Sequence, residues 1–153
     1  MEIKYLADNI IFAENVADWI YSEFISGIKH GISYNQLLSS IEVSYKTELP
    51  IRLIAVENDR CVGTVALEQN DLKCRDYTPW LAALFVDKAY RRKTIGEQLI
   101  GRVVSIAKEL GYSELYLRTE NTSDYYRKLG WQFIESCVDE FGLIPDVFKF
   151  TLA

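Results

Sequence analysis

The 153-residue chain contains one histidine and three cysteines. With His30 as the only histidine, a Ser-His-Asp or Cys-His site has a single candidate centre, and no second member of such a site is apparent. Because a glycine follows His30, we expect His30 to lie at a helix end and not to be catalytic. The cysteines lack the spacing of metal ligands. We therefore expect no metal site, and reduced thiols at Cys61, Cys74 and Cys137.

The sequence also lacks long hydrophobic runs and an excess of positive charge. No segment approaches the uninterrupted apolar length of a membrane span, and residues 1–8 lack the basic start and apolar core of a signal peptide. The formal net charge of −5 argues against general nucleic-acid binding, which needs a broad basic face. We expect a cytoplasmic protein whose partners include neither membrane nor nucleic acid.

The remaining composition, 49% hydrophobic and 25% charged, is typical of one globular domain spanning residues 1–153. Hydrophobic periodicity predicts the order β-α-α-β-β-β-α-β-α-β-β. The strands are expected at 3–6, 52–56, 62–67, 79–86, 114–118, 131–136 and 147–152. The helices are expected to begin at Asn9 or Glu14, after a capping box at Ser33 and Gln36, and at Ile95, and the last helix is expected to be capped by Ser123 or Asp124.

The arrangement of these elements predicts the sheet. The pair 52–56 and 62–67 is a hairpin and therefore antiparallel, whereas the strand–helix–strand unit around 95–110 implies a parallel crossover. The strand at 79–86 is almost wholly apolar, which is typical of a central strand buried on both faces. We expect an α/β (α+β) fold with a mixed, mostly antiparallel sheet of about six to seven strands flanked by helices.

A basic loop separates the central strand from the helix at 95–110. Arg91, Arg92 and Lys93 lie just before the first turn of this helix, where backbone N–H groups have no intrahelical partner. Cations beside the positive end of a helix dipole are unfavourable unless an anion lies between them. The loop therefore predicts a site for a phosphate-bearing ligand, with a solvated turn as the alternative.

Two motifs resemble one known family. Residues 86–96, VDKAYRRKTIG, resemble the acyl-CoA-binding motif of the GNAT N-acetyltransferases, Arg/Gln-x-x-Gly-x-Gly/Ala after a Val-containing strand. Residues 126–131, YRKLGW, resemble the family's Tyr-x-x-Leu-Gly-Phe block, and one helix and one strand separate the two blocks, as in the family. The resemblance covers about Arg52 to Phe133. It implies a GNAT-like fold and acetyl transfer from acetyl-CoA to a primary amine by direct attack in a ternary complex.

The resemblance also implies the cofactor site. N–H groups of the basic loop would bind the pyrophosphate, and the end of the central strand would pair with the pantetheine arm and polarise the thioester carbonyl. Asn121 would touch the cofactor, although a turn or capping role is an equal alternative, and Ser123 is a further candidate. The predicted cofactor-binding residues are Leu84, Phe85, Val86, Arg91, Arg92, Lys93, Thr94, Ile95, Gly96 and Asn121.

The catalytic residues implied by the resemblance are Tyr126 and Glu68. Tyr126 would protonate the departing thiolate, since a phenol with a pKa near ~10 stays protonated at neutral pH; a core aromatic is the alternative. Tyr125 is one position off the family's spacing. Glu68 would serve as the base or hold the cationic amine, and a surface carboxylate is an equally open interpretation. Asp71 and Glu120 are the next candidates for the base.

The chain departs from the family pattern at Thr94, which occupies the first glycine position of the Gly-x-Gly pair. A β-branched residue tolerates strained backbone dihedrals poorly. Its hydroxyl could donate a hydrogen bond to a phosphate oxygen, or the substitution could weaken cofactor binding. The sequence leaves both outcomes open.

The acceptor pocket would be lined by residues 19–33, 69–78 and 137–146. The last segment carries three acidic and no basic residues, which favours a positively charged small-molecule or peptide amine, or is a solvated acidic loop.

Edge strands could pair two copies into a homodimer. A non-catalytic acyl-CoA-binding or sensing module remains an alternative. A phosphate or nucleotide binder unrelated to CoA is a third interpretation, although the chain lacks the P-loop and dinucleotide motifs.

Overall fold

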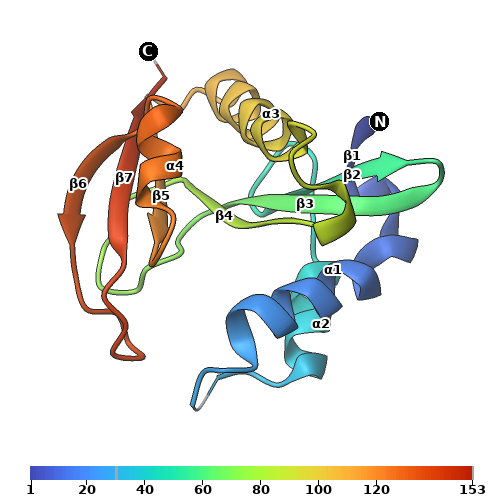
Figure 1. Ribbon diagram of the computed structural model, residues 1–153, viewed down its shortest axis with the longest axis horizontal. Helices are drawn as coiled ribbons and strands as arrows, with labels where there is room; N and C mark the ends of the chain where they lie inside the picture. The colour runs from blue at the N-terminus through green and yellow to red at the C-terminus, as the bar shows by residue number, and fades with distance from the viewer. Residues whose placement is uncertain (30, 153) are drawn as a thin grey trace.

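The computed structural model describes residues 1–29 and 31–152 (Figure 1). Within them, the sheet has seven strands in the order β1-β2-β3-β4-β5-β7-β6. The strands are β1 (Glu2–Tyr5), β2 (Ile51–Glu57), β3 (Arg60–Glu68), β4 (Trp80–Val86), β5 (Glu114–Thr119), β6 (Gln132–Ser136) and β7 (Asp146–Thr151). Only the β4–β5 pair is parallel. The mixed, mostly antiparallel sheet is therefore confirmed, whereas the expectation for His30 falls outside the described residues.

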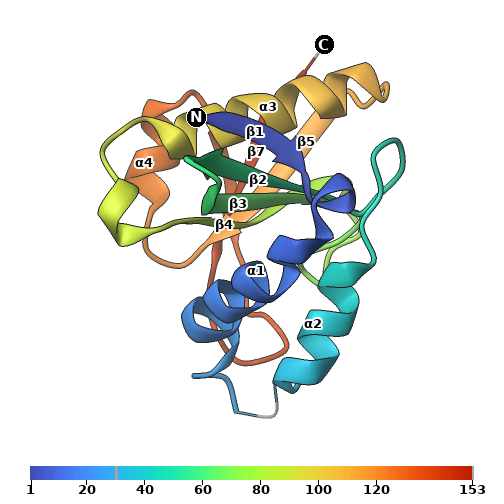
Figure 2. The ribbon, with the colours of Figure 1, turned by 90° about the vertical axis from the view of Figure 1, so that its right-hand side faces the viewer.

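Helices cover both faces of the sheet (Figure 2). One face carries α1 (Ala13–Ile20), which continues into the π-helical turn η3 (Tyr21–Ile25), and α2 (Tyr34–Glu42). The other face carries α3 (Ile95–Glu109) and α4 (Ser123–Lys128). Short 3₁₀ turns are η1 (Leu6–Asp8), η2 (Ile10–Phe12) and η4 (Lys88–Tyr90). None of the helices in the described part of the chain is long and apolar enough to cross a membrane.

The two faces of the sheet have separate cores because successive strand residues point to opposite sides. On β2, Leu53 packs into the core beneath α3, together with Leu99 and Val103. Its neighbour Ile54 packs into the core beneath α1 and α2, which also contains Val16. This alternation fixes the register of β2 and leaves the helices on either side of one continuous sheet.

Most helix boundaries follow local sequence signals. The predicted capping box is confirmed, since the Gln36 N–H donates to Ser33 Oγ (3.2 Å) and the Ser33 N–H donates to Gln36 Oε1 (2.9 Å). The predicted cap of α4 at Ser123 or Asp124 is wrong by one or two positions, because Thr122 precedes the first helical residue. The Ser123 hydroxyl instead donates to Asp146 Oδ2 at the start of β7 (2.6 Å).

The expectation that β4 is buried on both faces holds only for its first half. Trp80, Leu81 and Ala82 are buried, whereas residues 83–86 are half-buried. The cause is that β4 and β5 pair only at Trp80 and Tyr116 and then diverge (Figure 1). Ala83, with φ of +52°, forms a bulge where the β3–β4 register shifts, and such a bulge bends its strand. The divergence opens a wedge in the middle of the sheet.

Candidate active site

The wedge between β4 and β5 leads into a cavity of about 890 Å³. We call its two parts the α3 end and the α1 end. The residues of the α3 end are Leu84, Phe85, Val86, Tyr90, Arg91, Arg92, Thr94, Ile95, Gly96, Asn121, Tyr125 and Tyr126. The residues of the α1 end include Glu23, Phe24, Ile25, Ile28, Leu37, Arg52, Glu68, Asp71, Arg118, Asp139, Glu140, Phe141 and Leu143.

Most of the predicted site residues therefore lie around one cavity. Of the predicted cofactor-binding residues, only Lys93 does not line it, and its ammonium lies 5.2 Å from the centre of the Tyr90 ring. All three segments predicted to form the acceptor pocket contribute lining residues at the α1 end, among them Phe24, Asp71 and Phe141. Segments far apart in sequence thus converge where the sheet opens.

The start of α3 presents backbone N–H groups to the α3 end. The first intrahelical hydrogen bond runs from the Gln98 N–H to the Thr94 carbonyl (3.0 Å). The N–H groups of Ile95 and Gly96 therefore precede it, at the positive end of the helix dipole. Arg92 lines the cavity at the same point. This arrangement favours the binding of a phosphate group.

Two residues of the loop before α3 have a left-handed backbone conformation. Arg92 has φ of +66° and Thr94 has φ of +63°. Glycine adopts such angles at no steric cost, which explains why the family pattern has glycine at the position of Thr94. The Thr94 hydroxyl accepts a hydrogen bond from Gln98 Nε2 (3.0 Å), so its own hydrogen remains available to a ligand. Thr94 thus keeps the loop shape at a cost in backbone strain.

Gly96 allows a close approach between α3 and α4. A Cβ at this position would lie 3.2 Å from the Tyr125 hydroxyl. Tyr125 therefore reaches the start of α3, whereas Tyr126 packs edge-on against Trp131. The two neighbouring tyrosines line different parts of the same cavity.

The end of β4 offers one free backbone edge. Phe85 pairs with Thr64 and Val86 with Gly63 on the β3 side, while no pairing with β5 is formed here within the described residues. Arg91 braces this strand end, since its Nε donates to the Val86 carbonyl (2.9 Å) and its guanidinium lies 5.3 Å from the centre of the Phe85 ring. Strand edges of this kind bind extended amide-containing ligands. Sequence reasoning did not predict the bulge at Ala83 that frees the edge.

Tyr126 is buried at the meeting point of α4 with β7 and lines the cavity. Burial, with a smaller contribution from Tyr125, raises the pKa of the Tyr126 phenol well above its ordinary value. The phenol therefore carries its proton throughout the neutral range. A group in this state can act as a proton donor but not as a base.

The carboxylates of the α1 end differ in their partners. Glu68 forms an ion pair with Arg52 (2.8 Å), and Glu120 forms one with Arg118 (2.8 Å). Burial, followed by repulsion from Glu68, raises the pKa of Asp71 to about 7, and Arg118 limits this rise. The carboxyl group of Asp71 can therefore exchange a proton near neutral pH.

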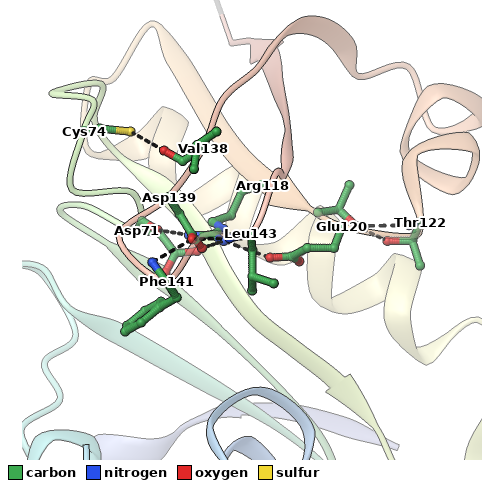
Figure 3. A network of polar contacts seen from close by, with 10 residues as sticks. Asp71, Cys74, Arg118, Glu120, Thr122, Val138, Asp139, Phe141 and Leu143 are labelled. Atoms are coloured by element: carbon green, nitrogen blue, oxygen red, sulfur yellow. Dashed lines mark hydrogen bonds and ion pairs between the residues drawn. The ribbon is translucent and has the colours of Figure 1, made fainter. Parts of the chain in front are cut away.

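Arg118 ties together three segments around this end of the cavity (Figure 3). Its Nη2 donates to Asp139 Oδ2 (2.5 Å) and to Glu120 Oε1 (2.8 Å), and its Nη1 donates to the Asp71 carbonyl (3.4 Å). Sequence reasoning did not single out Arg118. The available signal was an arginine in an otherwise largely apolar strand.

Asp139 anchors the β6–β7 loop, residues 137–145, to this network. Its side chain is 1% exposed, and its Oδ1 accepts hydrogen bonds from the N–H groups of Phe141 (2.9 Å) and Leu143 (2.8 Å). Although burial opposes ionisation, the bonds from Arg118, Leu143 and Phe141 hold the pKa of Asp139 below its ordinary value. The loop is thereby fixed as a wall of the cavity.

A sheet opened at its parallel pair, with a helix start and a free strand edge at the opening, is the architecture of acyl-CoA acyltransferases. Residues 14–131 match the model of the Acetyltransferase (GNAT) family, and the chain belongs to this family. This membership confirms the predicted fold and acetyl-CoA as the co-substrate. Within the described residues, no group of three or more His, Cys, Asp or Glu side chains is arranged to hold a metal ion.

Solved structures share this fold at low sequence identity. An aminoglycoside 6'-N-acetyltransferase complexed with coenzyme A has a TM-score of 0.78 and 16% identity, over 100% of this chain and 98% of that one. The aminoglycoside 6'-N-acetyltransferase of Enterococcus faecium has a TM-score of 0.75 and 16% identity, over 100% and 98%. The Salmonella typhimurium protein yncA, solved with its cofactor acetyl-CoA, has a TM-score of 0.71 and 17% identity, over 100% and 94%. No curated protein matches the sequence.

The strain at Thr94 predicts the effect of its replacement by glycine. The left-handed conformation costs a non-glycine residue about 1–2 kcal/mol, and glycine loses part of this gain through its greater backbone entropy. We expect Thr94→Gly to raise the free energy of unfolding by about 0.5–1 kcal/mol in urea denaturation. Thr94→Ala, which removes the hydroxyl but keeps the strain, is the control. A Thr94→Gly protein less stable than the Thr94→Ala protein would contradict this interpretation.

Proposed function

We propose that the protein transfers the acetyl group of acetyl-CoA to a primary amine of a small molecule or peptide, by direct attack in a ternary complex. The observation that carries the proposal is that one cavity joins a phosphate-binding helix start to a protonated phenol and a carboxyl group with a pKa near neutrality. The similarity in fold to aminoglycoside acetyltransferases favours a small-molecule acceptor.

In this proposal, the α3 end holds the co-substrate. The N–H groups of Ile95 and Gly96 bind the pyrophosphate, and Arg92 neutralises part of its charge. The free edge of β4 at residues 84–86 pairs with amide groups of the pantetheine arm. Backbone N–H groups of this β4 edge also polarise the thioester carbonyl. Arg91 acts mainly by bracing Val86, which keeps this edge in place.

Asp71 is proposed as the base in preference to Glu68. A free alkylammonium group has a pKa near ~10.4, so the acceptor must lose a proton before it attacks. A base with a pKa near the working pH combines an adequate ionised fraction with adequate basicity. Glu68 is held by Arg52, and its charge raises the pKa of Asp71. Its proposed role is therefore to tune Asp71.

Tyr126 is proposed as the acid. As the new C–N bond forms and the thioester C–S bond breaks, Tyr126 gives its proton to the sulfur. The acceptor ammonium first loses one proton to Asp71, which releases it to solvent, and the attacking nitrogen then loses a second proton to Asp71. The amide, the free thiol of CoA and one proton in solvent are therefore the balanced products. Tyr126 recovers its proton through solvent before the next cycle. Because its pKa is raised, Tyr126 remains in the donor form over the working pH range.

The role of Tyr126 predicts a selective loss of turnover. In Tyr126→Phe, we expect kcat to fall by about 10²-fold, because a positioned proton donor contributes about that factor or more. The Kd for CoA, measured by calorimetry, should stay within about twofold. Tyr112→Phe, which removes a partly buried phenol away from the cavity, serves as the control. Wild-type activity in Tyr126→Phe would exclude the acid role, and CoA binding without turnover in the wild type would favour an acyl-CoA-sensing module.

The role of Asp71 predicts the pH dependence of the reaction. We expect kcat/KM to rise with pH to a plateau above about 7 and to fall by about 10²-fold in Asp71→Asn. Glu68→Gln should shift the rising limb to lower pH, because the Glu68 charge raises the pKa of Asp71. Arg118, which lowers that pKa, is unchanged in this variant. Asp76→Asn, an exposed carboxylate in the same loop, is the control. A rising limb retained in Asp71→Asn would assign the base elsewhere.

Stability provides an independent test of the environment of Asp71. Its pKa is about 7 in the folded protein, against an ordinary value of 3.8 for an aspartate side chain, so folding disfavours its ionised form. This cost is absent below pH 4, grows between pH 4 and 7, and is complete above pH 7. Asp71→Asn should therefore be more stable than the wild type at pH 8 and similar to it at pH 4, as measured by thermal unfolding. Equal stabilities at both pH values would contradict the raised pKa.

A further inference from the structure

The α1 end of the cavity displays exposed apolar side chains. Phe24 of η3 is 42% exposed, and Phe141 and Leu143 of the β6–β7 loop are 45% and 42% exposed. All three line the cavity, as do the aliphatic side chains of Ile25 and Ile28. Large apolar side chains exposed within a cavity indicate a ligand that covers them.

These apolar side chains are held in place. The N–H groups of both Phe141 and Leu143 donate to Asp139 Oδ1, and Asp139 is itself buried and bonded to Arg118 (Figure 3). Withdrawing the backbone of these two residues from the cavity would break their hydrogen bonds to the buried Asp139 carboxylate. Their exposure is a preformed feature of the cavity wall, which lowers the entropic cost of binding an apolar group.

The same end of the cavity is acidic. Among the described residues, two basic side chains line it, and both form ion pairs there, Arg52 with Glu68 and Arg118 with Asp139 and Glu120. Further acidic residues with no ion-pair partner among the described residues are Glu23, Asp71 and Glu140. An excess of carboxylates around an apolar surface is complementary to a ligand that is both cationic and apolar.

We propose that the acceptor is a cationic amine with an alkyl or aryl body. Phe24, Phe141 and Leu143 contact the body, while the carboxylates at Glu23, Asp71 and Glu140 select the charge. A polyhydroxylated amino sugar fits less well, because its hydroxyl groups would lose water against three apolar side chains without gaining hydrogen bonds. This inference rests on the proposed acetyl transfer and specifies its acceptor.

The first test compares acceptors of equal charge. Thiol release from acetyl-CoA is measured with ethylamine, hexylamine, 2-phenylethylamine and glucosamine, and with the polycation kanamycin. We expect kcat/KM for 2-phenylethylamine to exceed that for ethylamine and for both amino sugars by about tenfold or more. A higher kcat/KM for kanamycin or glucosamine than for 2-phenylethylamine would overturn the inference while leaving acetyl transfer intact.

Binding provides a second readout that does not depend on turnover. Calorimetry with CoA-loaded protein should give a Kd for 2-phenylethylamine at least about tenfold lower than for ethylamine, and also at least about tenfold lower than for the neutral analogue 2-phenylethanol. Equal affinities within either pair would refute the apolar or the cationic part of the inference, respectively. Binding of the amines without thiol release would refute the proposed function alone.

Variants assign the preference to particular side chains. In Phe141→Ser, we expect the ratio of the KM for 2-phenylethylamine to the KM for ethylamine to rise by about tenfold. Phe24→Ser should act in the same direction. Ile144→Ser is the matched control, because Ile144 lies in the same loop and is 63% exposed but does not line the cavity. An unchanged ratio in both Phe variants, or an equal rise in the Ile144 variant, would overturn the inference.

Discussion

The divergence of β4 from β5 is the constraint on which the site depends. Two parallel strands at the centre of a sheet normally satisfy each other's backbone groups along their whole length. Here they pair at a single position and then separate, with the bulge at Ala83 bending β4. The unpaired edge leaves backbone groups of β4 accessible to a ligand, and the amide-rich pantetheine arm is the ligand that we propose for it. The same separation brings α3, from one face, and the loops of the other face to one cavity.

Arg118 maintains the shape of the opened sheet. Past the point of divergence, β5 forms no further pairing with β4 within the described residues. The Arg118 guanidinium connects the adjoining loops through bonds to Asp71, Glu120 and Asp139. A lysine has one charged centre and could not reach three segments in this fixed geometry. Removing one member of a buried pair costs about 3–5 kcal/mol, because the other charge is left without a partner. The network therefore contributes to rigidity and to the electrostatics of Asp71.

The features that could be predicted from the sequence are local. The order of elements, the Ser33–Gln36 capping box and the basic loop before α3 depend on residues within one or two helical turns of each other. The bulge at Ala83 could not be predicted, because Ala-Ala-Leu carries no turn signal and the bulge depends on pairing with β3. The ion pair of Glu68 and the electrostatic surroundings of Asp71 involve Arg52 and Arg118, which are distant in sequence. Such contacts arise only once the sheet is assembled.

The backbone shape of the β6–β7 loop is fixed independently of the side chains that it presents to the cavity. The Asp139 carboxylate accepts hydrogen bonds from the main-chain N–H groups of residues 141 and 143. Every residue except proline has such a group. The side chains at these two positions take no part in these hydrogen bonds and line the cavity. Residues there can be exchanged while the backbone frame stays constant. A lineage could thus change which molecules it modifies by drift at a few positions, with little risk to folding.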